Sequence, residues 1–175
     1  MNEAMQAARF LKAGQRSLAV LGLVSLSLLG RLPFAIATAP PPAVTAPLRL
    51  EISLSRRQLT LYQGQTPLRR YPVAVGRPGW ETPIGQFQVR EMIRDPAWKN
   101  PFTGAVIAGG HPRNPLGRRW IGFWSDGTNW VGLHGTPNPD SIGHAVSHGC
   151  VRMYNRDIEE LFEKVQPGVP VIVVR

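Results

Sequence analysis

The fold is decided by residues 48–75, which read LRLEISLSRRQLTLYQGQTPLRRYPVAV. Runs of β-forming side chains alternate here with short turn signals, a pattern typical of neighbouring strands. It predicts strands over 48–54, 58–62 and 68–75. The pattern continues along the chain and predicts further strands over 85–93, 105–108, 120–124, 130–133 and 169–174. An all-β sandwich or barrel is therefore indicated.

One segment near the end of the chain breaks the β pattern. Asn155 can cap a helix there, and Asp157 and Glu159 suit the positive N-terminal end of that helix. Its apolar face consists of Ile158, Leu161, Phe162 and Val165. Pro167-Gly168 ends it. We expect a mainly β domain with one short helix, which packs on the sheet and fixes the segment before it.

The first 39 residues have the pattern of an export signal. Three basic side chains precede the apolar run 17–29, and small residues follow at 35–39. Because a membrane span needs roughly 20 residues, residues 1–39 are interpreted as a signal peptide or an N-terminal membrane anchor. The Pro-rich stretch 40–47 predicts a semi-rigid linker, which leaves 48–175 as the folded domain. The protein is expected to be exported to the periplasm or cell envelope, with membrane contact only through its N-terminal segment.

Charge narrows the class of partner. The chain has a net charge of +9, and residues 48–175 contribute 16 Lys/Arg against 10 Asp/Glu. Such a surface favours anionic partners. Nucleic acid is not expected, because the basic residues are scattered and no aromatic-rich binding motif accompanies them. The anionic cell envelope fits an exported protein better, and a solvated surface without a specific partner remains the alternative.

Three of the four histidines and the only cysteine lie within residues 134–157. A thiol becomes a useful nucleophile as thiolate, and a neighbouring imidazole supplies the base or the positive field that favours this form. His134, His144 and His148 are candidate partners for Cys150. On an extended strand His148 and Cys150 would share a face, with Gly149 allowing close approach of a substrate carbonyl. Backbone N–H groups near Gly149 and Cys150 would then stabilise the negative charge of acyl transfer.

The same four side chains also have to be considered as zinc ligands. Zinc sites use four protein ligands, or three with one open position. The spacing here fits neither paired Cys-x-x-Cys nor His-Glu-x-x-His, so a cysteine nucleophile is favoured over a metal site. His111 has no companion and His144 lies in a loop, and both are interpreted as structural or solvated side chains.

The block Ser147-His148-Gly149-Cys150-Val151-Arg152-Met153, preceded by His134-Gly135-Thr136, resembles the signature of the L,D-transpeptidase catalytic domain, the YkuD-like family. Further blocks match at Gly76 with 82–87 and at 114–120. The similarity covers about residues 48–175.

The resemblance implies a β-rich fold and a cysteine enzyme acting on peptidoglycan stem peptides. Cys150 would be the nucleophile and His134 the general base, while Ser147, His148, Gly149 and Arg152 would form the substrate and oxyanion environment. A thioester would form at the bond between a diamino acid and D-Ala, D-Ala would leave, and an amine would accept the acyl group. Carbapenem β-lactams are expected inhibitors, and neither a cofactor nor a metal is implied.

Two positions depart from some relatives. Arg152 stands where some members have Asn, which leaves the acceptor amine open, and a salt bridge to Asp157 or another acid is its alternative role. Gly135 stands where some have Ser, so a backbone carbonyl has to hold the His134 tautomer. Two other functions are alternatives to a transpeptidase. An L,D-carboxypeptidase would use water as acceptor, whereas a catalytically silent cell-wall-binding module would not need the intact His134 and Cys150.

Overall fold

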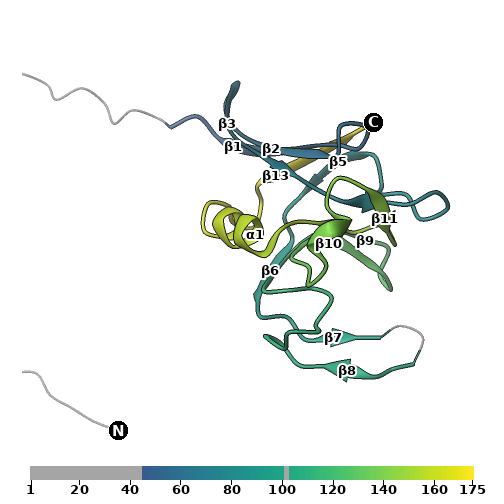
Figure 1. Ribbon diagram of the computed structural model, residues 1–175. Helices are drawn as coiled ribbons and strands as arrows, with labels where there is room; N and C mark the ends of the chain where they lie inside the picture. The colour runs from purple at the N-terminus through teal and green to yellow at the C-terminus, as the bar shows by residue number, and fades with distance from the viewer. Residues whose placement is uncertain (1–44, 101–102) are drawn as a thin grey trace, which may run out of the picture. The chain divides into compact units, whose positions relative to one another are not determined.

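The computed structural model describes residues 45–100 and 103–175 (Figure 1). The expected signal peptide or anchor over 1–39, and residues 40–44 of the expected linker, lie outside the described residues. In the described part of the chain, no helix has the length and apolar character needed to cross a bilayer.

A five-stranded sheet contains both the first and the last strand of the domain. Its strands, in spatial order, are β3 (Thr66–Pro72), β2 (Gln58–Gln63), β1 (Leu48–Ser53), β13 (Pro170–Val174) and β5 (Gly85–Gln88). The first three form an antiparallel meander, as the turn signals between them predict. β13 then pairs in parallel with β1, so that Leu50 lies opposite Val171 (Figure 1).

A second sheet of four strands contains His134 and Arg152, two of the predicted site residues. In spatial order it contains β12 (Val151–Arg152), β10 (Trp130–His134), β9 (Arg119–Ser125) and β6 (Glu91–Arg94). Two smaller pairs flank it. They are β4 (Val75–Gly76) with β11 (Ala145–Ser147), and β7 (Trp98–Lys99) with β8 (Val106–Ile107). A 3-10 turn, Pro139–Ser141, lies in the loop after β10.

The core lies between these two sheets and α1 (Asn155–Phe162), the one α-helix within residues 45–100 and 103–175. Alternate residues of β1, β2 and β13 are fully buried, as are Ile121 and Phe123 of β9. α1 packs against β9 and β10 through Ile158, Leu161 and Phe162. Complete burial of an aliphatic or aromatic side chain contributes roughly 1.5–3 kcal/mol. This burial holds the helix directly behind β10, the strand that ends in His134.

The mainly β expectation with one short helix after Cys150 is confirmed, but several boundaries differ. The strand expected over 85–93 is two strands in different sheets. The chain changes sheets between Val89, whose N–H donates to the Val169 carbonyl, and Arg90, whose N–H donates to the Gly122 carbonyl. The strand expected over 68–75 likewise ends at Pro72, before β4 begins.

The helix boundaries were also predicted incorrectly. Tyr154 occupies the N-cap position and makes no side-chain cap hydrogen bond. Asn155 is instead the first helical residue, and its side-chain amide donates to the Thr136 carbonyl. The helix ends at Phe162, so the buried Val165 lies beyond it.

Candidate active site

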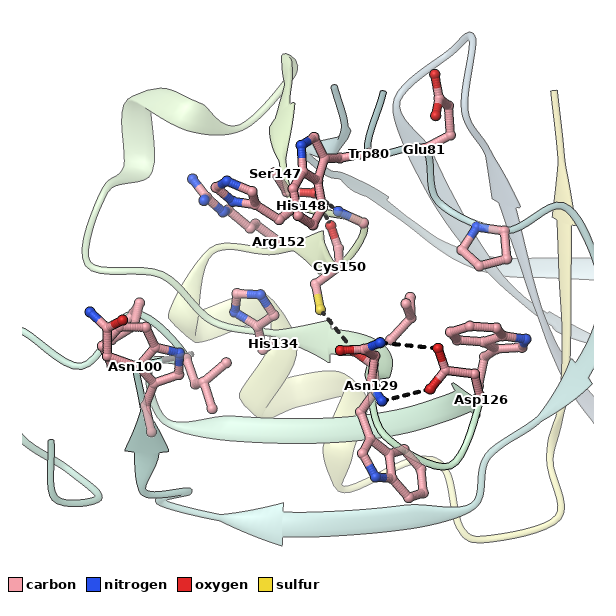
Figure 2. A pocket seen from close by; sticks show the side chains of 18 residues that line it. Trp80, Glu81, Asn100, Asp126, Asn129, His134, Ser147, His148, Cys150 and Arg152 are labelled. Atoms are coloured by element: carbon pink, nitrogen blue, oxygen red, sulfur yellow. Dashed lines mark hydrogen bonds between the residues drawn. The ribbon is translucent and has the colours of Figure 1, made fainter. Parts of the chain in front are cut away.

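All six site residues predicted from the sequence line one pocket of about 620 Å³ (Figure 2). They are His134, Ser147, His148, Gly149, Cys150 and Arg152. Four indole side chains, those of Trp80, Trp98, Trp124 and Trp130, line the same pocket and give it largely apolar walls. The pocket is therefore suited to an extended ligand with both apolar and charged groups.

The segment around Cys150 is a turn, so the shared face that an extended strand would give His148 and Cys150 is absent. β11 ends at Ser147 and β12 begins at Val151, and Gly149 between them has φ +106°, a conformation that side chains with a Cβ rarely adopt. His148 and Cys150 consequently do not share a strand face. The His148 ring contacts Trp80, whereas the Cys150 thiol points toward the Trp130 carbonyl, with Sγ at 3.7 Å from that oxygen.

The Cys150 thiol is protonated in the resting site. Burial raises its pKa above the ordinary value, although the N–H of Gly132 and the positive charge of Arg152 act in the opposite direction. A protonated thiol is a weak nucleophile, so this cysteine needs a base that takes its proton during attack.

His134 ends β10 and is buried, with 5% of its surface exposed. Its Nδ1 donates to the Gly135 carbonyl at 2.5 Å, which confirms that a backbone carbonyl holds the ring. Burial, assisted by the charge of Arg152, lowers the His134 pKa to about 4, while the Gly135 carbonyl opposes this change. The imidazole is thus neutral at neutral pH, and Nε2 is its unprotonated nitrogen.

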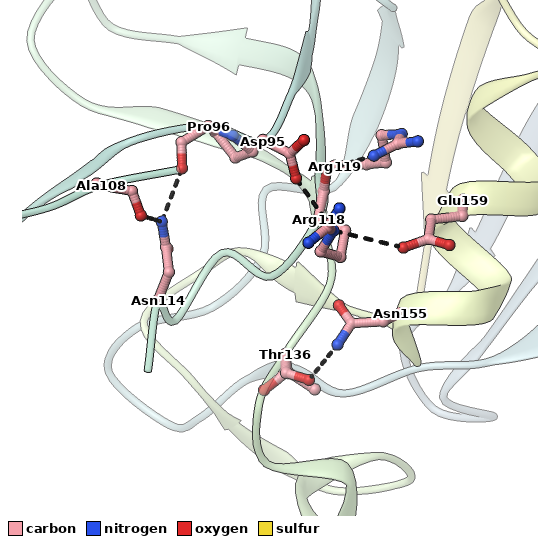
Figure 3. Close-up of polar contacts among 9 residues, drawn as sticks. All are labelled: Asp95, Pro96, Ala108, Asn114, Arg118, Arg119, Thr136, Asn155 and Glu159. Carbon is pink, nitrogen blue, oxygen red and sulfur yellow. Dashed lines mark hydrogen bonds and ion pairs between the residues drawn. The ribbon is translucent and has the colours of Figure 1, made fainter. Parts of the chain in front are cut away.

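Asn155 of α1 supports the segment that holds His134 (Figure 3). Its Nδ2 donates to the Thr136 carbonyl at 3.1 Å. Its Oδ1 is buried without a donor in the described part of the chain, and it packs against the backbones of Gly117 and Gly135. A Cβ at Gly135 would lie 2.0 Å from Oδ1, and one at Gly117 would lie 2.2 Å from it. The glycine at position 135 therefore accommodates this amide.

His148 is exposed and has a different environment from His134. Its Nε2 lies 2.9 Å from Nη2 of Arg77, so the guanidinium donates and the ring accepts. Its pKa is lowered by the partial loss of solvent around the ring and by the charges of Arg77 and Arg152. The ring also contacts Trp80 edge to face, at 4.9 Å between centroids. With Nε2 occupied by Arg77, His148 is suited to orienting this wall of the pocket.

Arg152 lies at the pocket, and the proposed salt bridge to Asp157 is wrong. Asp157 pairs with Arg156 at 3.4 Å. Within residues 45–100 and 103–175, no acidic side chain forms an ion pair with Arg152. The backbone of Arg152 exchanges two hydrogen bonds with Ala74, both of 2.9 Å, which fix the strand that follows Cys150.

The other two histidines do not line this pocket. His144 is exposed, and its backbone bonds to Ser141 and Val75. His111 accepts a hydrogen bond from the Arg113 N–H. Among the described residues, no three His, Cys, Asp or Glu side chains gather where they could hold a metal ion.

The L,D-transpeptidase catalytic domain model of the YkuD family matches residues 47–173. The chain belongs to this family. A putative L,D-transpeptidase YkuD of Bacillus licheniformis is 37% identical to it, over 74% of this chain and 67% of the relative. The NMR structure of the E. faecium L,D-transpeptidase catalytic domain is 25% identical, with a TM-score of 0.57 over 73% of this chain and 96% of that one. An L,D-transpeptidase solved in complex with imipenem is also 25% identical, with a TM-score of 0.60.

The match to that imipenem complex covers 73% of this chain and 58% of the solved one. Family membership confirms the expected resemblance, the L,D-transpeptidase fold and the class of enzyme. It also supports a function in cell-wall chemistry. Arg77 and the supporting role of Asn155 were missed by the sequence reasoning. Both depend on contacts between distant segments, although Arg77 directly follows the glycine of a matching block.

Proposed function

We propose that the domain is a peptidoglycan L,D-transpeptidase in which Cys150 forms a thioester with a stem peptide. One observation carries this proposal. A protonated thiol and a neutral, carbonyl-held imidazole line the same pocket, in a chain of the L,D-transpeptidase family. The first is the nucleophile of acyl transfer and the second is its base.

The reaction follows from the protonation states. Because the His134 pKa is low and the thiol pKa is high, a standing ion pair is unfavourable, so Nε2 takes the thiol proton as sulfur attacks the carbonyl carbon. The C–N bond to D-Ala then breaks, and its nitrogen receives the proton from His134. In the second half, an acceptor amine attacks the thioester, gives a proton to His134, and releases the sulfur as thiolate. The proton then returns to the sulfur, a new amide is formed, and the enzyme is restored.

The charged and aromatic side chains suit the proposed substrate. A stem peptide carries carboxylates, and Arg152 presents a guanidinium beside Cys150 that no described acid neutralises. Arg77 adds a second positive charge through its contact with His148. The indoles provide apolar surface for the methylene chain of a diamino acid.

The decisive experiment is incubation of the purified protein with a disaccharide tetrapeptide, followed by mass analysis of the products. Release of D-Ala with a cross-linked dimer is the expected result. Release of D-Ala with only the tripeptide product would identify water as the acceptor and an L,D-carboxypeptidase. No release of D-Ala from any tetrapeptide, by a folded protein, would overturn the proposal. Cys150→Ala is the matched control and should release none.

A carbapenem provides an independent probe of Cys150. Because an L,D-transpeptidase with the same fold has been solved in complex with imipenem, we expect imipenem to acylate Cys150 by opening its lactam. Intact mass should then rise by the mass of one drug molecule. An adduct of the same size on Cys150→Ala would place the reaction elsewhere.

The domain is further proposed to act outside the cytoplasmic membrane, where peptidoglycan lies. The basic residues followed by the apolar run 17–29 support this. Fusing residues 1–47 to a phosphatase that is active only after export tests it. An inactive but stable fusion would contradict export, and the size of the fusion separates a cleaved signal from an anchor.

A further inference from the structure

Two buried hydroxyl groups hold the backbone around Cys150. The side chain of Thr82 is 2% exposed, and its Oγ1 accepts from the Gly76 N–H at 3.1 Å and donates to the Gly149 carbonyl at 2.9 Å. Ser147 is 1% exposed, and its Oγ accepts from the Gly149 N–H at 3.2 Å and donates to the Cys150 carbonyl at 2.5 Å. Thr82 and Ser147 together are called the hydroxyl clamp.

The hydroxyl clamp engages three of the four backbone polar groups of Gly149 and Cys150. The fourth, the Cys150 N–H, donates to no acceptor within residues 45–100 and 103–175. In a trans peptide the carbonyl and the N–H point to opposite sides. The bond from Thr82 to the Gly149 carbonyl therefore directs the Cys150 N–H away from Thr82.

The hydroxyl clamp is itself rigidly placed. Ser147 of β11 is paired with Gly76 of β4, and the Gly76 N–H donates to the Thr82 hydroxyl, so both hydroxyls are attached to one small sheet. The turn from Gly76 to Thr82 is tight, because a Cβ at Gly76 would lie 2.1 Å from the Trp80 carbonyl oxygen and 2.6 Å from the Thr82 nitrogen. A peptide held in this way does not have to reorganise when charge develops beside it.

We infer that Thr82 and Ser147 are positioning residues that fix the Gly149–Cys150 peptide so that the Cys150 N–H donates to the oxyanion of the substrate carbonyl. This inference rests on the proposed acyl transfer at Cys150. The sequence predicted oxyanion donors near both Gly149 and Cys150. The inference selects the Cys150 N–H as the donor, because the Gly149 N–H already donates to the Ser147 hydroxyl. Ser147 acts through the backbone, because its hydroxyl is bonded to the Gly149 N–H and the Cys150 carbonyl.

Loss of one oxyanion donor typically slows acyl transfer by about 10² to 10³-fold. Thr82→Val keeps the shape of the side chain but leaves the Gly149 carbonyl and the Gly76 N–H without their partner. Because Ser147 still holds the two flanking peptides, through the Gly149 N–H and the Cys150 carbonyl, the Cys150 N–H should be displaced from its best direction but not lost as a donor. We expect acylation by imipenem to slow by about 10 to 100-fold.

The test compares two reactions of the same sulfur. Imipenem acylation builds an oxyanion, whereas alkylation by iodoacetamide displaces iodide from a saturated carbon and builds none. In Thr82→Val the acylation rate should fall while the alkylation rate stays within about twofold of wild type. Thr82→Ser retains the hydroxyl and should restore acylation to within about threefold. Thermal unfolding of each variant checks that the domain remains folded.

Equal acylation rates in wild type and Thr82→Val would overturn the inference, as would an equal loss of acylation and alkylation. If Thr82→Val does not fold, Ser147→Ala is the second test variant. Its readout is the same ratio of the acylation rate to the alkylation rate. Formation of an adduct on Cys150→Ala would instead contradict the proposed function itself, because another residue would then be the one that is acylated. The two failures are therefore distinguishable.

Discussion

The low pKa of His134 predicts a specific loss of stability in mild acid. An unfolded histidine titrates near 6.5, whereas burial holds the pKa of His134 in the folded domain at about 4. Between these values the unfolded chain binds a proton that the folded chain does not. Stability therefore rises with pH in this window and falls as the solution is acidified. Above pH 6.5 the imidazole is neutral in both states and contributes no pH dependence.

The magnitude follows from the two pKa values. Each pH unit in the window corresponds to about 1.4 kcal/mol, so lowering the pH from 6.5 to about 4 removes about 3 kcal/mol through His134 alone. This is a large share of the roughly 5–15 kcal/mol that stabilises a typical domain.

Urea unfolding between about pH 7.5 and pH 4 measures this effect, with His134→Gln as the matched control. Gln retains an N–H that can reach the Gly135 carbonyl but does not titrate. The loss of stability in acid that arises from carboxylates and other groups is common to both proteins. It therefore cancels in the difference between their free energies of unfolding. The free energy of unfolding of wild type should approach that of the variant by about 3 kcal/mol on acidification. Parallel curves would refute the neutral, buried state of His134.

Three further predictions concern the same region. Gly135→Ala should destabilise the domain by about 2–3 kcal/mol, because its Cβ would overlap Oδ1 of Asn155; adding Asn155→Ala should recover part of that loss in a double-mutant cycle measured by urea unfolding. His134→Ala should slow single-turnover acylation by about 10² to 10⁴-fold, whereas the exposed His144→Ala should change it less than about threefold, and equal damage would mean that the base was wrongly chosen. EDTA should not reduce turnover, and a loss that zinc restores would establish the metal alternative.

The sequence predicted the long strands more accurately than the short strands beside them. β1, β2 and β10 contain enough alternating apolar residues to define a strand. β7 and β12 have two residues each, too few for any periodicity, and they exist because of the strands beside them. The sequence predicts one strand over 85–93, since no local signal marks the change of sheet at Val89.

The candidate site shows the same division. The choice of Cys150 and His134, and the expectation that a backbone carbonyl holds the His134 ring, came from a local block of residues and its resemblance to the family. The contacts of Thr82, Arg77 and Asn155 join segments that are far apart in the chain, so local patterns could not reveal them. Asn155 shows the limit most clearly, because a residue suited to capping a helix is used for tertiary contact.

The parallel pairing of β1 with β13 has a consequence for biosynthesis. Leu50 cannot pair with Val171 until β13 has been synthesised and has left the ribosome. Hairpins among the first three strands can form earlier, but the inner edge of β1 stays open. The five-stranded sheet therefore stays incomplete while the residues between β1 and β13 are being synthesised, and during that time β1 presents an unpaired edge that a chaperone can cover.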